Sequence, residues 1–248
     1  AQDVTKIKEN EKELRKINLS LERANDELMQ FSYRSSHDLK APLIAIRGLS
    51  EVILEDIDEG MFDEAKKNVS IIKEQATTLE VLVKDLLDLA RADISDDNVE
   101  EINFEELIHE VFSLNHLQAC ANSVEMDYEL LLYSKWEYPH ARILQICNNL
   151  VSNSVKYFDP EKSHKFVKVI VKEVSDTLEI TVEDNGSGIP YQDKKEVFEM
   201  FKRYHSKNIM GSGIGMYVLK KHVDALDGAI DFSSSEEGTT FIINLPRL

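Results

Sequence analysis

Apolar residues recur every seven positions in the first thirty residues of the chain. One row consists of Ile7, Leu14, Leu21 and Leu28. A second row, three residues behind it, consists of Asn10, Ile17, Ala24 and Phe31. A charged helix with so narrow an apolar stripe is marginal in water when it is isolated. The pattern therefore predicts a parallel dimeric coiled coil over residues 1–30, with a single solvated helix as the alternative.

The helical pattern continues to about Ile57, and a turn signal follows at residues 58–61. From Phe62 to Ala90, apolar residues then alternate spacings of three and four. This stripe is wider than one partner helix can cover. Residues 31–93 are therefore predicted to form a helical hairpin that pairs with a second copy, giving a four-helix bundle in a homodimer.

The periodicity changes after the hairpin. Residues 94–101 are acidic and polar, which predicts a linker between domains. In residues 102–248, helical patterns cover 104–121, 139–157, 196–201 and 213–226. Strand-like patterns cover 124–132, 166–174, 177–182, 229–233 and 239–245. This mixture predicts an α+β sandwich in which helices cover one face of a mixed sheet.

Charge and cysteine usage narrow the range of partners. The 248 residues carry a net charge of -17, which argues against a nucleic-acid partner and against an anionic membrane surface. Cys120 and Cys147 lie in apolar helical patterns, which favours reduced thiols and a cytoplasmic location. Because the chain begins at Ala1 inside a heptad pattern, we expect a fragment of a longer protein with a sensor domain upstream.

One histidine and one carboxylate are adjacent in the helical segment, at His37 and Asp38. The heptad places Ser35 and Asp38 at seam positions and His37 beside the seam, on the outward face. Pro42 removes the backbone donor that would bond the carbonyl of Asp38, so we expect a bend one turn past His37. Taken alone, a single histidine here indicates an ordinary surface histidine on a solvated helix rather than a catalytic residue.

Five of the nine glycines lie between positions 186 and 215, in two clusters. In the first cluster, Gly186 and Gly188 follow Asp184 at the end of a predicted strand, where a carboxylate can accept a hydrogen bond from a base. The second cluster consists of Gly211, Gly213 and Gly215. It runs directly into a predicted helix, whose first backbone N–H groups can bind phosphate oxygens. Either cluster alone occurs in several unrelated folds.

A polar stripe interrupts the apolar helix predicted over residues 139–157. Asn149, Asn153 and Lys156 are spaced by four and three residues, so they lie on one face. Amide oxygens can hold Mg²⁺ and a lysine can reach phosphate, which makes the stripe suitable for a triphosphate with its metal. A polar surface stripe is the alternative.

In chain order, these motifs resemble those of sensor histidine kinases. The stretch from Phe31 to Leu43, which contains His37, resembles their phosphoacceptor box. The amide stripe, the two glycine clusters and the stretch 197–204 resemble the nucleotide-binding boxes of the Bergerat ATPases, the group that includes gyrase B, Hsp90 and MutL. The stretch 238–241 matches the last conserved strand, so the resemblance spans residues 31–245.

The resemblance implies that residues 102–248 form a Bergerat ATP-binding domain. It implies ATP-dependent autophosphorylation of His37, with Asp38 orienting the imidazole, and phosphotransfer to an aspartate of a response regulator. Asp184 would bind the adenine amino group with support from Thr240, and Asn153 would hold Mg²⁺ with Asn149 nearby. The other implied nucleotide contacts are Lys156, Tyr157, Gly186, Gly188, Arg203, Gly211, Gly213 and Gly215.

Two competing functions are a nucleotide-sensing scaffold without chemistry and an ATPase of the gyrase or Hsp90 kind. The presence of Asp38, Asn153 and Arg203 argues against the scaffold. The lid, the segment 202–210 between the two glycine clusters, is short, and this and the upstream histidine helix argue against the second function. Ala41 stands where many related kinases carry Thr or Asn, whose side chain holds a hydrolytic water. The resemblance therefore implies weak phosphatase activity.

Overall fold

The computed structural model describes residues 2–92, 98–190, 194–202 and 212–248. Contacts within the chain define two compact units, Ala1–Glu80 and Val81–Leu248. Among the described helices, none is both long enough and apolar enough to cross a membrane.

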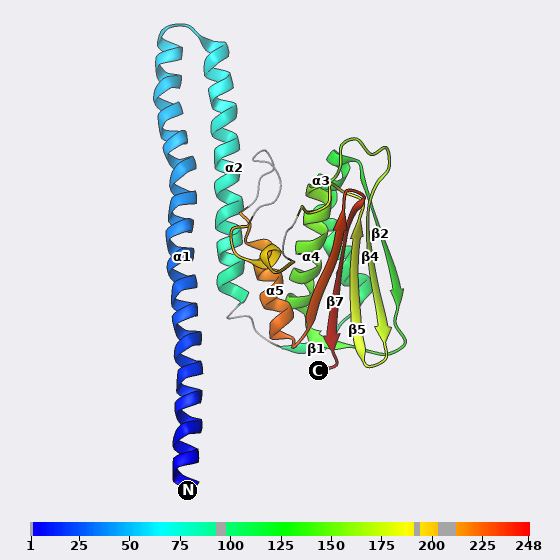
Figure 1. Cartoon of the computed structure of the whole chain (residues 1–248). Coiled ribbons are helices and arrows are strands. Elements are labelled where there is room, and N and C mark those ends of the chain that lie inside the picture. The colour runs from blue at the N-terminus through cyan, green and yellow to red at the C-terminus, as the bar shows by residue number, and fades with distance from the viewer. Residues whose placement is uncertain (1, 93–97, 191–193, 203–211) are drawn as a thin grey trace. The chain divides into compact units, whose positions relative to one another are not determined.

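The first unit is a pair of antiparallel helices (Figure 1). Helix α1 spans Gln2–Asp58 and runs through Pro42, and α2 spans Phe62–Ala92. At the turn, the Met61 amide donates to the carbonyl of Asp56 at 2.7 Å. The buried Asp56 carboxylate accepts a hydrogen bond from Asn68 Nδ2 at 3.0 Å. The backbone of the predicted coiled coil is helical, whereas the side chains of its seam residues from Ile7 to Leu28 lie outside the described part of the structure.

The second unit is built on one five-stranded sheet with the order β2-β4-β5-β7-β6. Its strands are β2 (Val124–Leu131), β4 (Lys165–Val174), β5 (Thr177–Asp184), β6 (Ala229–Ser235) and β7 (Gly238–Pro246). Strands β2 and β4 are parallel, and the other neighbouring strands are antiparallel. The sheet is therefore mixed, as the sequence pattern predicted.

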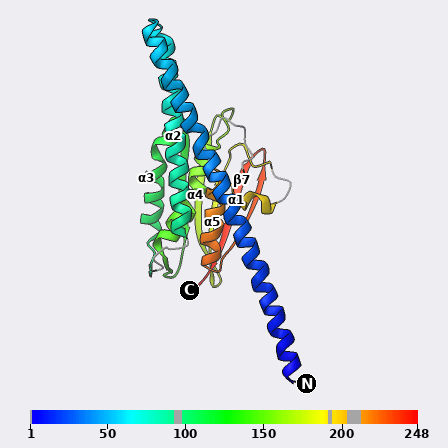
Figure 2. The same cartoon turned by 90° about the vertical axis from the view of Figure 1, so that its left-hand side faces the viewer.

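Three helices cover one face of this sheet, namely α3 (Phe104–Asn122), α4 (His140–Lys156) and α5 (Gly215–Ala225) (Figures 1 and 2). Their apolar faces meet alternate residues of the strands, such as Leu178, Ile180 and Val182 of β5, all fully buried. Burial of one face of each element is the source of the two hydrophobic periods seen in the sequence. The predicted fold class is confirmed.

Two short strands were not predicted. Strand β1 (Val99–Glu101) pairs antiparallel with β3 (Glu137–Pro139), and β1 lies inside the segment predicted as a linker. All three residues of β1 are exposed, so the strand carries no alternation of polar and apolar positions. Lys135 and Glu101 form an ion pair at 2.7 Å beside this small sheet.

The segment predicted as a helix over 196–201 is a 3₁₀ helix, η1 (Lys194–Phe198). Helix α5 begins at Gly215, two residues later than predicted. Gly213 adopts φ +75°, a conformation that cannot belong to a right-handed helix, so the chain turns there before α5 starts.

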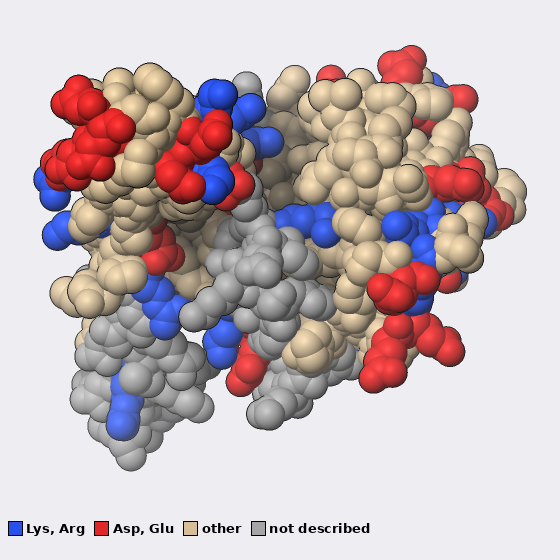
Figure 3. Space-filling view, turned by 90° about the horizontal axis from the view of Figure 1, so that it is seen from above, with Lys and Arg blue, Asp and Glu red and all other residues tan. Residues whose placement is uncertain are grey.

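Charged side chains of both signs are present on the described surface. In the view of Figure 3, acidic and basic side chains are interspersed among neutral residues. The expectation that nucleic acid is not a partner stays a prediction from the net charge of -17.

Candidate active site

The histidine singled out by the sequence lies on α1 with its side chain 72% exposed. His37 Nδ1 lies 3.1 Å from Asp38 Oδ1. An ionised carboxylate can accept a hydrogen bond but cannot donate one, so the proton of this contact belongs to Nδ1. The other ring nitrogen, Nε2, then carries the free lone pair. The pair therefore presents a nucleophilic nitrogen at the surface of the first unit.

The serine near this pair lies on the inner side of the helix. Ser35 Oγ is buried and has no hydrogen-bond partner within the described part of the chain. This agrees with the seam position that the heptad gave to Ser35. Asp38 is more exposed, with 44% of its side chain accessible, because it turns toward His37.

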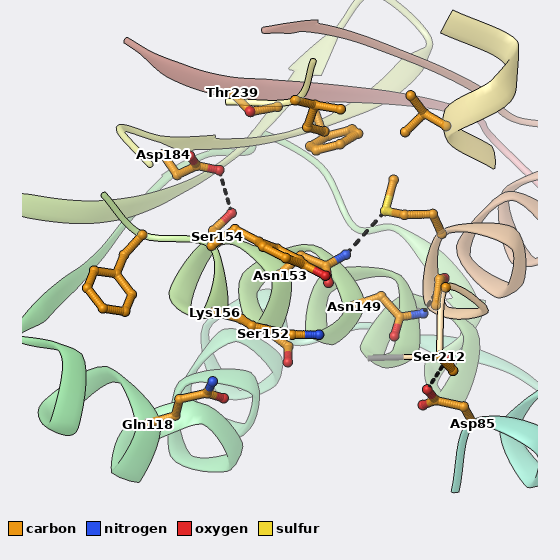
Figure 4. Close-up of a pocket in the computed structure, with 18 of the residues that line it drawn as sticks. Asp85, Gln118, Asn149, Ser152, Asn153, Ser154, Lys156, Asp184, Ser212 and Thr239 are labelled. Carbon is orange, nitrogen blue, oxygen red and sulfur yellow. Dashed lines mark hydrogen bonds between the residues drawn. The ribbon is translucent and has the colours of Figure 1, made fainter. Parts of the chain in front are cut away.

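The second unit contains a cavity of about 590 Å³ (Figure 4). Helix α4, the facing ends of β5 and β7, the start of α5 and the last turns of α2 contribute to its wall. The predicted site residues that line it are Asn149, Asn153, Lys156, Tyr157, Asp184, Gly188, Gly213 and Gly215. Arg203 and Gly211 lie outside the described residues. The cavity thus gathers residues that are far apart in the sequence, such as Asn149 and Gly215, which are 66 positions apart.

Asp184, at the end of β5, is held by three hydrogen bonds. Ser154 Oγ donates to its Oδ2 at 2.8 Å, and the Gly186 amide donates to its Oδ1 at 2.8 Å. The Thr239 amide donates to the same carboxylate. Burial raises the pKa of Asp184 above its usual range, while these donors and the positive charge of Lys162 act in the opposite direction. A buried acceptor with a fixed orientation is suited to binding an amino group.

The structure places Thr239, rather than the predicted Thr240, against the cavity. Thr239 is opposite Asp184 in the β5–β7 ladder, and Thr240 is opposite Glu183. Successive side chains of a strand point to opposite faces, so a shift of one residue changes the face completely. Gly186 is also absent from the cavity wall, and it contributes its amide to Asp184 instead.

The amides of α4 connect the cavity to α5. Asn153 Nδ2 lies 3.2 Å from Met216 Sδ, and Asn149 Nδ2 donates to the carbonyl of Gly215 at 3.2 Å. Gln145 Nε2 donates to Asn149 Oδ1 at 3.5 Å, so both ends of the Asn149 amide are engaged. The contact with Met216 leaves Asn153 Oδ1 as the amide oxygen for a cation. One protein oxygen suits Mg²⁺, which completes its shell with waters and phosphate oxygens.

Two glycines of the cavity wall are required by close approach. A Cβ at Gly188 would lie 1.9 Å from the carbonyl oxygen of Ser235, and the residue has φ +68°. A Cβ at Gly213 would lie 2.8 Å from the carbonyl oxygen of Lys202. No other residue fits either position without moving backbone.

Two lysines border the cavity, Lys156 in the last turn of α4 and Lys202 after η1. Lys156 Nζ lies 4.8 Å from the centroid of the Tyr157 ring. Lys202 also lines the cavity and lies 3.6 Å from Glu196 and 3.5 Å from Glu199. Both lysines border the same space, which gives that part of the wall positive charge suited to a polyanion.

Several residues of the site were not found from the sequence. Ser154 follows Asn153, and a small polar residue on the buried face of α4 was a signal that could have revealed it. Ser212 Oγ donates to the carboxylate of Asp85, whose pKa is raised by burial. Asp85 lies on α2 and 127 residues from Ser212, so no local pattern connects the two.

Two protein-family models match the chain. The model described as "His Kinase A (phospho-acceptor) domain" matches residues 27–94. The model described as "Histidine kinase-, DNA gyrase B-, and HSP90-like ATPase" matches residues 139–248. The first match contains His37, and the second contains the amide stripe and both glycine clusters.

Curated relatives match most of the chain. Cyanobacterial phytochrome B of Nostoc sp. is 30% identical over 238 residues, which cover 94% of this chain and 31% of the relative. Sensor histidine kinase WalK of Bacillus subtilis is 30% identical over 237 residues, which cover 91% of this chain and 38% of the relative. The chain therefore spans about a third of the length of these relatives.

Solved structures share the fold. Acinetobacter baumannii histidine kinase AdeS matches with a TM-score of 0.65 and 22% identity, over 85% of this chain and 98% of that one. Histidine kinase ThkA, solved in complex with response regulator protein TrrA, matches with a TM-score of 0.66 and 23% identity. The match covers 88% of this chain and 61% of the ThkA chain. With a phospho-acceptor domain followed by the matching ATPase domain, and relatives that share both, this chain belongs to the sensor histidine kinase family.

Proposed function

We propose that this chain is the autophosphorylating core of a sensor histidine kinase. It transfers the γ-phosphoryl group of ATP to His37 and then to an aspartate of a response regulator. The observation that supports this most is the presence, in one chain, of a histidine whose Nδ1 contacts a carboxylate and a cavity whose base-binding acceptor is already fixed.

In the phosphorylation step, the lone pair of His37 Nε2 attacks the γ-phosphorus of ATP. The new bond joins Nε2 to phosphorus, the bond between phosphorus and the β,γ-bridging oxygen breaks, and ADP leaves with that electron pair. Asp38 holds the proton on Nδ1 and stabilises the positive charge that the ring acquires during attack. Phosphoryl transfer depends mainly on positioning and on charge stabilisation, both of which these groups supply.

Asp184 accepts a hydrogen bond from the adenine amino group in this proposal. Ser154 and Gly186 each donate a hydrogen bond to one of its two oxygens, so the carboxylate needs little reorientation when the base binds. We assign phosphate or ribose contacts to Lys156, Tyr157 and Arg203, and wrapping of the phosphates to Gly211, Gly213 and Gly215. Full-length ShkA, solved in complex with AMPPNP, has the same fold with a TM-score of 0.60, which supports a nucleotide at this place.

Magnesium fits the donor set of the cavity, and we assign it to Asn153 Oδ1. When bound, the ion would neutralise charge on the triphosphate. Asn149 stays committed to Gly215 and Gln145, so its role here is to hold the start of α5 against α4.

The partners we propose are a second copy of the chain and a response regulator. The described part of the hairpin leaves large apolar side chains exposed, including Leu43, Leu54, Phe62 and Val69. A four-helix bundle of two hairpins would cover this surface. The complex of ThkA with TrrA supports a receiver domain as the second partner.

We also propose the domain division 1–30, 31–93, 94–101 and 102–248, an upstream sensor domain and a cytoplasmic location. The length of the relatives supports further domains in the full-length protein, since this chain spans about a third of them. Because Val99–Glu101 form strand β1 and pair with β3, this part of the predicted linker belongs to the folded second unit.

The experiment that tests the proposed function is incubation with γ-labelled ATP followed by acid or base treatment. Phosphohistidine is lost in acid and kept in base. Label with that stability supports the kinase. ATP binding without label would support a nucleotide-sensing scaffold, and steady ATP turnover without a phosphoprotein would support an ATPase of the gyrase or Hsp90 kind.

A further inference from the structure

Lys162, in the loop between α4 and β4, has an unusual set of partners. Its Nζ donates to the carbonyl oxygens of Asn185 at 2.8 Å and Glu237 at 2.9 Å. It also donates to those of Gly186 and Glu236, both at 3.2 Å. The side chain is 26% exposed. Four backbone carbonyls thus surround one ammonium group.

The geometry is that of a cation in an oxygen cage. An ammonium has three N–H donors, so four carbonyls must share them. A lysine head group is strongly hydrated in water, and these carbonyl dipoles replace the water that it loses. The nearest carboxylate oxygen, of Asp159, lies 3.9 Å away. Ordinary ion pairs of the same unit, such as Lys168 with Glu129 at 2.8 Å, are made directly to a carboxylate.

The four carbonyls come from two different turns. Asn185 and Gly186 follow β5, and Glu236 and Glu237 connect β6 with β7. Both turns border the base-binding acceptor. The Gly186 amide donates to Asp184 Oδ1, and a Cβ at Gly238 would lie 2.0 Å from the Asp184 carbonyl oxygen. Lys162 therefore binds the backbone next to Asp184 in one turn, at Asn185, and the backbone next to Gly238 in the other turn, at Glu237.

We propose that Lys162 is a positioning residue for the nucleotide, acting as a built-in cation that clamps the two turns around Asp184. Its four carbonyls would then accept a free monovalent cation, ammonium or potassium, once the side chain is removed. The nucleotide part of this inference rests on the proposed function, whereas the cation cage does not.

The first test compares ATP affinity by titration calorimetry for the 248-residue chain, Lys162→Met and Lys168→Met. Methionine keeps the apolar stem and removes the charge and the donors. We expect about tenfold weaker binding for Lys162→Met, because hydrogen bonds from a charged donor are lost. Lys168→Met removes an exposed ion pair and should change affinity by less than about twofold. Equal affinities for the two variants would overturn the positioning role.

The second test uses Lys162→Ala, in which the cage is empty. Its thermal unfolding midpoint and its ATP affinity are measured in ammonium, potassium or choline chloride at equal ionic strength. We expect ammonium and potassium to raise both values above those in choline, and to leave the unmodified chain unchanged. A lysine that only adds stability would show no such selectivity, so equal values in the three salts would overturn the cage.

The two tests separate this inference from the proposed function. The unfolding measurement needs no nucleotide. If the unmodified chain fails to bind ATP, the proposed function and the positioning role both fail, whatever the salts do. If it binds ATP and Lys162→Met binds equally well, the positioning role alone fails.

Discussion

At the scale of single residues, the proposed binding of ATP depends most on how the Asp184 carboxylate is held. The ionised carboxylate accepts a hydrogen bond from an amino group more strongly than the neutral acid does, yet burial raises its pKa. Ser154 and Gly186 compensate with one hydrogen bond to each oxygen. The residue is therefore an acceptor whose charge is sensitive to pH and to the loss of either donor.

The raised pKa of Asp184 predicts opposite effects of pH on binding and on stability. As pH falls from neutral through the raised pKa, the folded protein binds a proton before the unfolded chain does, so the free energy of unfolding without nucleotide should increase. ATP affinity should decrease over the same range, because protonation removes the negative charge and weakens the hydrogen bond that Asp184 accepts from the adenine amino group. Calorimetry and thermal unfolding at several pH values measure both.

Asp184→Asn is the control for this pH dependence. Asp85, whose pKa is also raised, adds its own pH dependence to the stability, and this part is unchanged in the variant. The variant should bind ATP at least about tenfold more weakly at neutral pH, because an NH2 group replaces one of the two acceptor oxygens and cannot accept a hydrogen bond. A variant that keeps the same affinity and the same pH dependence as the unmodified chain would exclude Asp184 as the base-binding residue.

Ser154 gives a second prediction at this scale. Ser154→Ala removes the donor to Asp184 Oδ2, so ATP affinity should fall about five- to tenfold. The loss should be greater at mildly acidic pH, because removal of a donor raises the pKa of Asp184 further. Ser163→Ala, at an exposed position of the α4–β4 loop, serves as the matched control. Identical binding curves for the two serine variants would remove Ser154 from the site.

At the scale of elements, periodicity predicted those helices and strands that bury one face. Helix α2 and strand β5 are examples, with boundaries within two residues of those expected. Strand β1 was missed because all its residues are exposed and only its backbone pairs. Thr239 and Thr240 are both threonine, so the sequence could not tell which one faces the cavity; the register with β5 decides it.

The hairpin gives the prediction that belongs to this scale. Leu54→Glu places a charge on an exposed apolar position of α1 and should convert the dimer to a monomer. Leu117→Glu, an even more exposed leucine on α3, should leave the mass unchanged. Light scattering at micromolar concentration measures both. A monomeric mass for the unmodified chain would contradict the four-helix bundle.

At the scale of the whole molecule, the proposed nucleophile and the proposed nucleotide cavity belong to different compact units. His37 lies in Ala1–Glu80, and every residue of the cavity wall lies in Val81–Leu248. Substitutions should therefore be able to alter ATP binding and the acceptance of the phosphoryl group by His37 separately. The links of Asp184 to Ser154 and Lys162 could not be predicted, because they depend on how distant loops meet after folding.

Ala41 leads to a prediction about the reaction with the regulator. Its methyl group lies one helical turn after His37 and can neither donate nor accept a hydrogen bond, so it cannot orient a hydrolytic water. The chain should therefore dephosphorylate its phosphorylated partner slowly, and Ala41→Thr should be faster. Loss of label from the purified partner measures this. Rapid clearance by the unmodified chain, far above the partner's own rate, would refute the role of Ala41.

The most direct measurement is localisation of the phosphoryl group after reaction with γ-labelled ATP, using peptide mass spectrometry under basic conditions. We expect phosphorylation of His37 in the unmodified chain and no phosphorylation of the His37→Gln variant. The Asp184→Asn variant should show strongly reduced phosphorylation of His37 at limiting ATP. His37→Gln should still bind ATP within about twofold of the unmodified chain, because its substitution lies outside the nucleotide-binding unit. Phosphorylation of His37→Gln at another residue to the same extent would contradict the account.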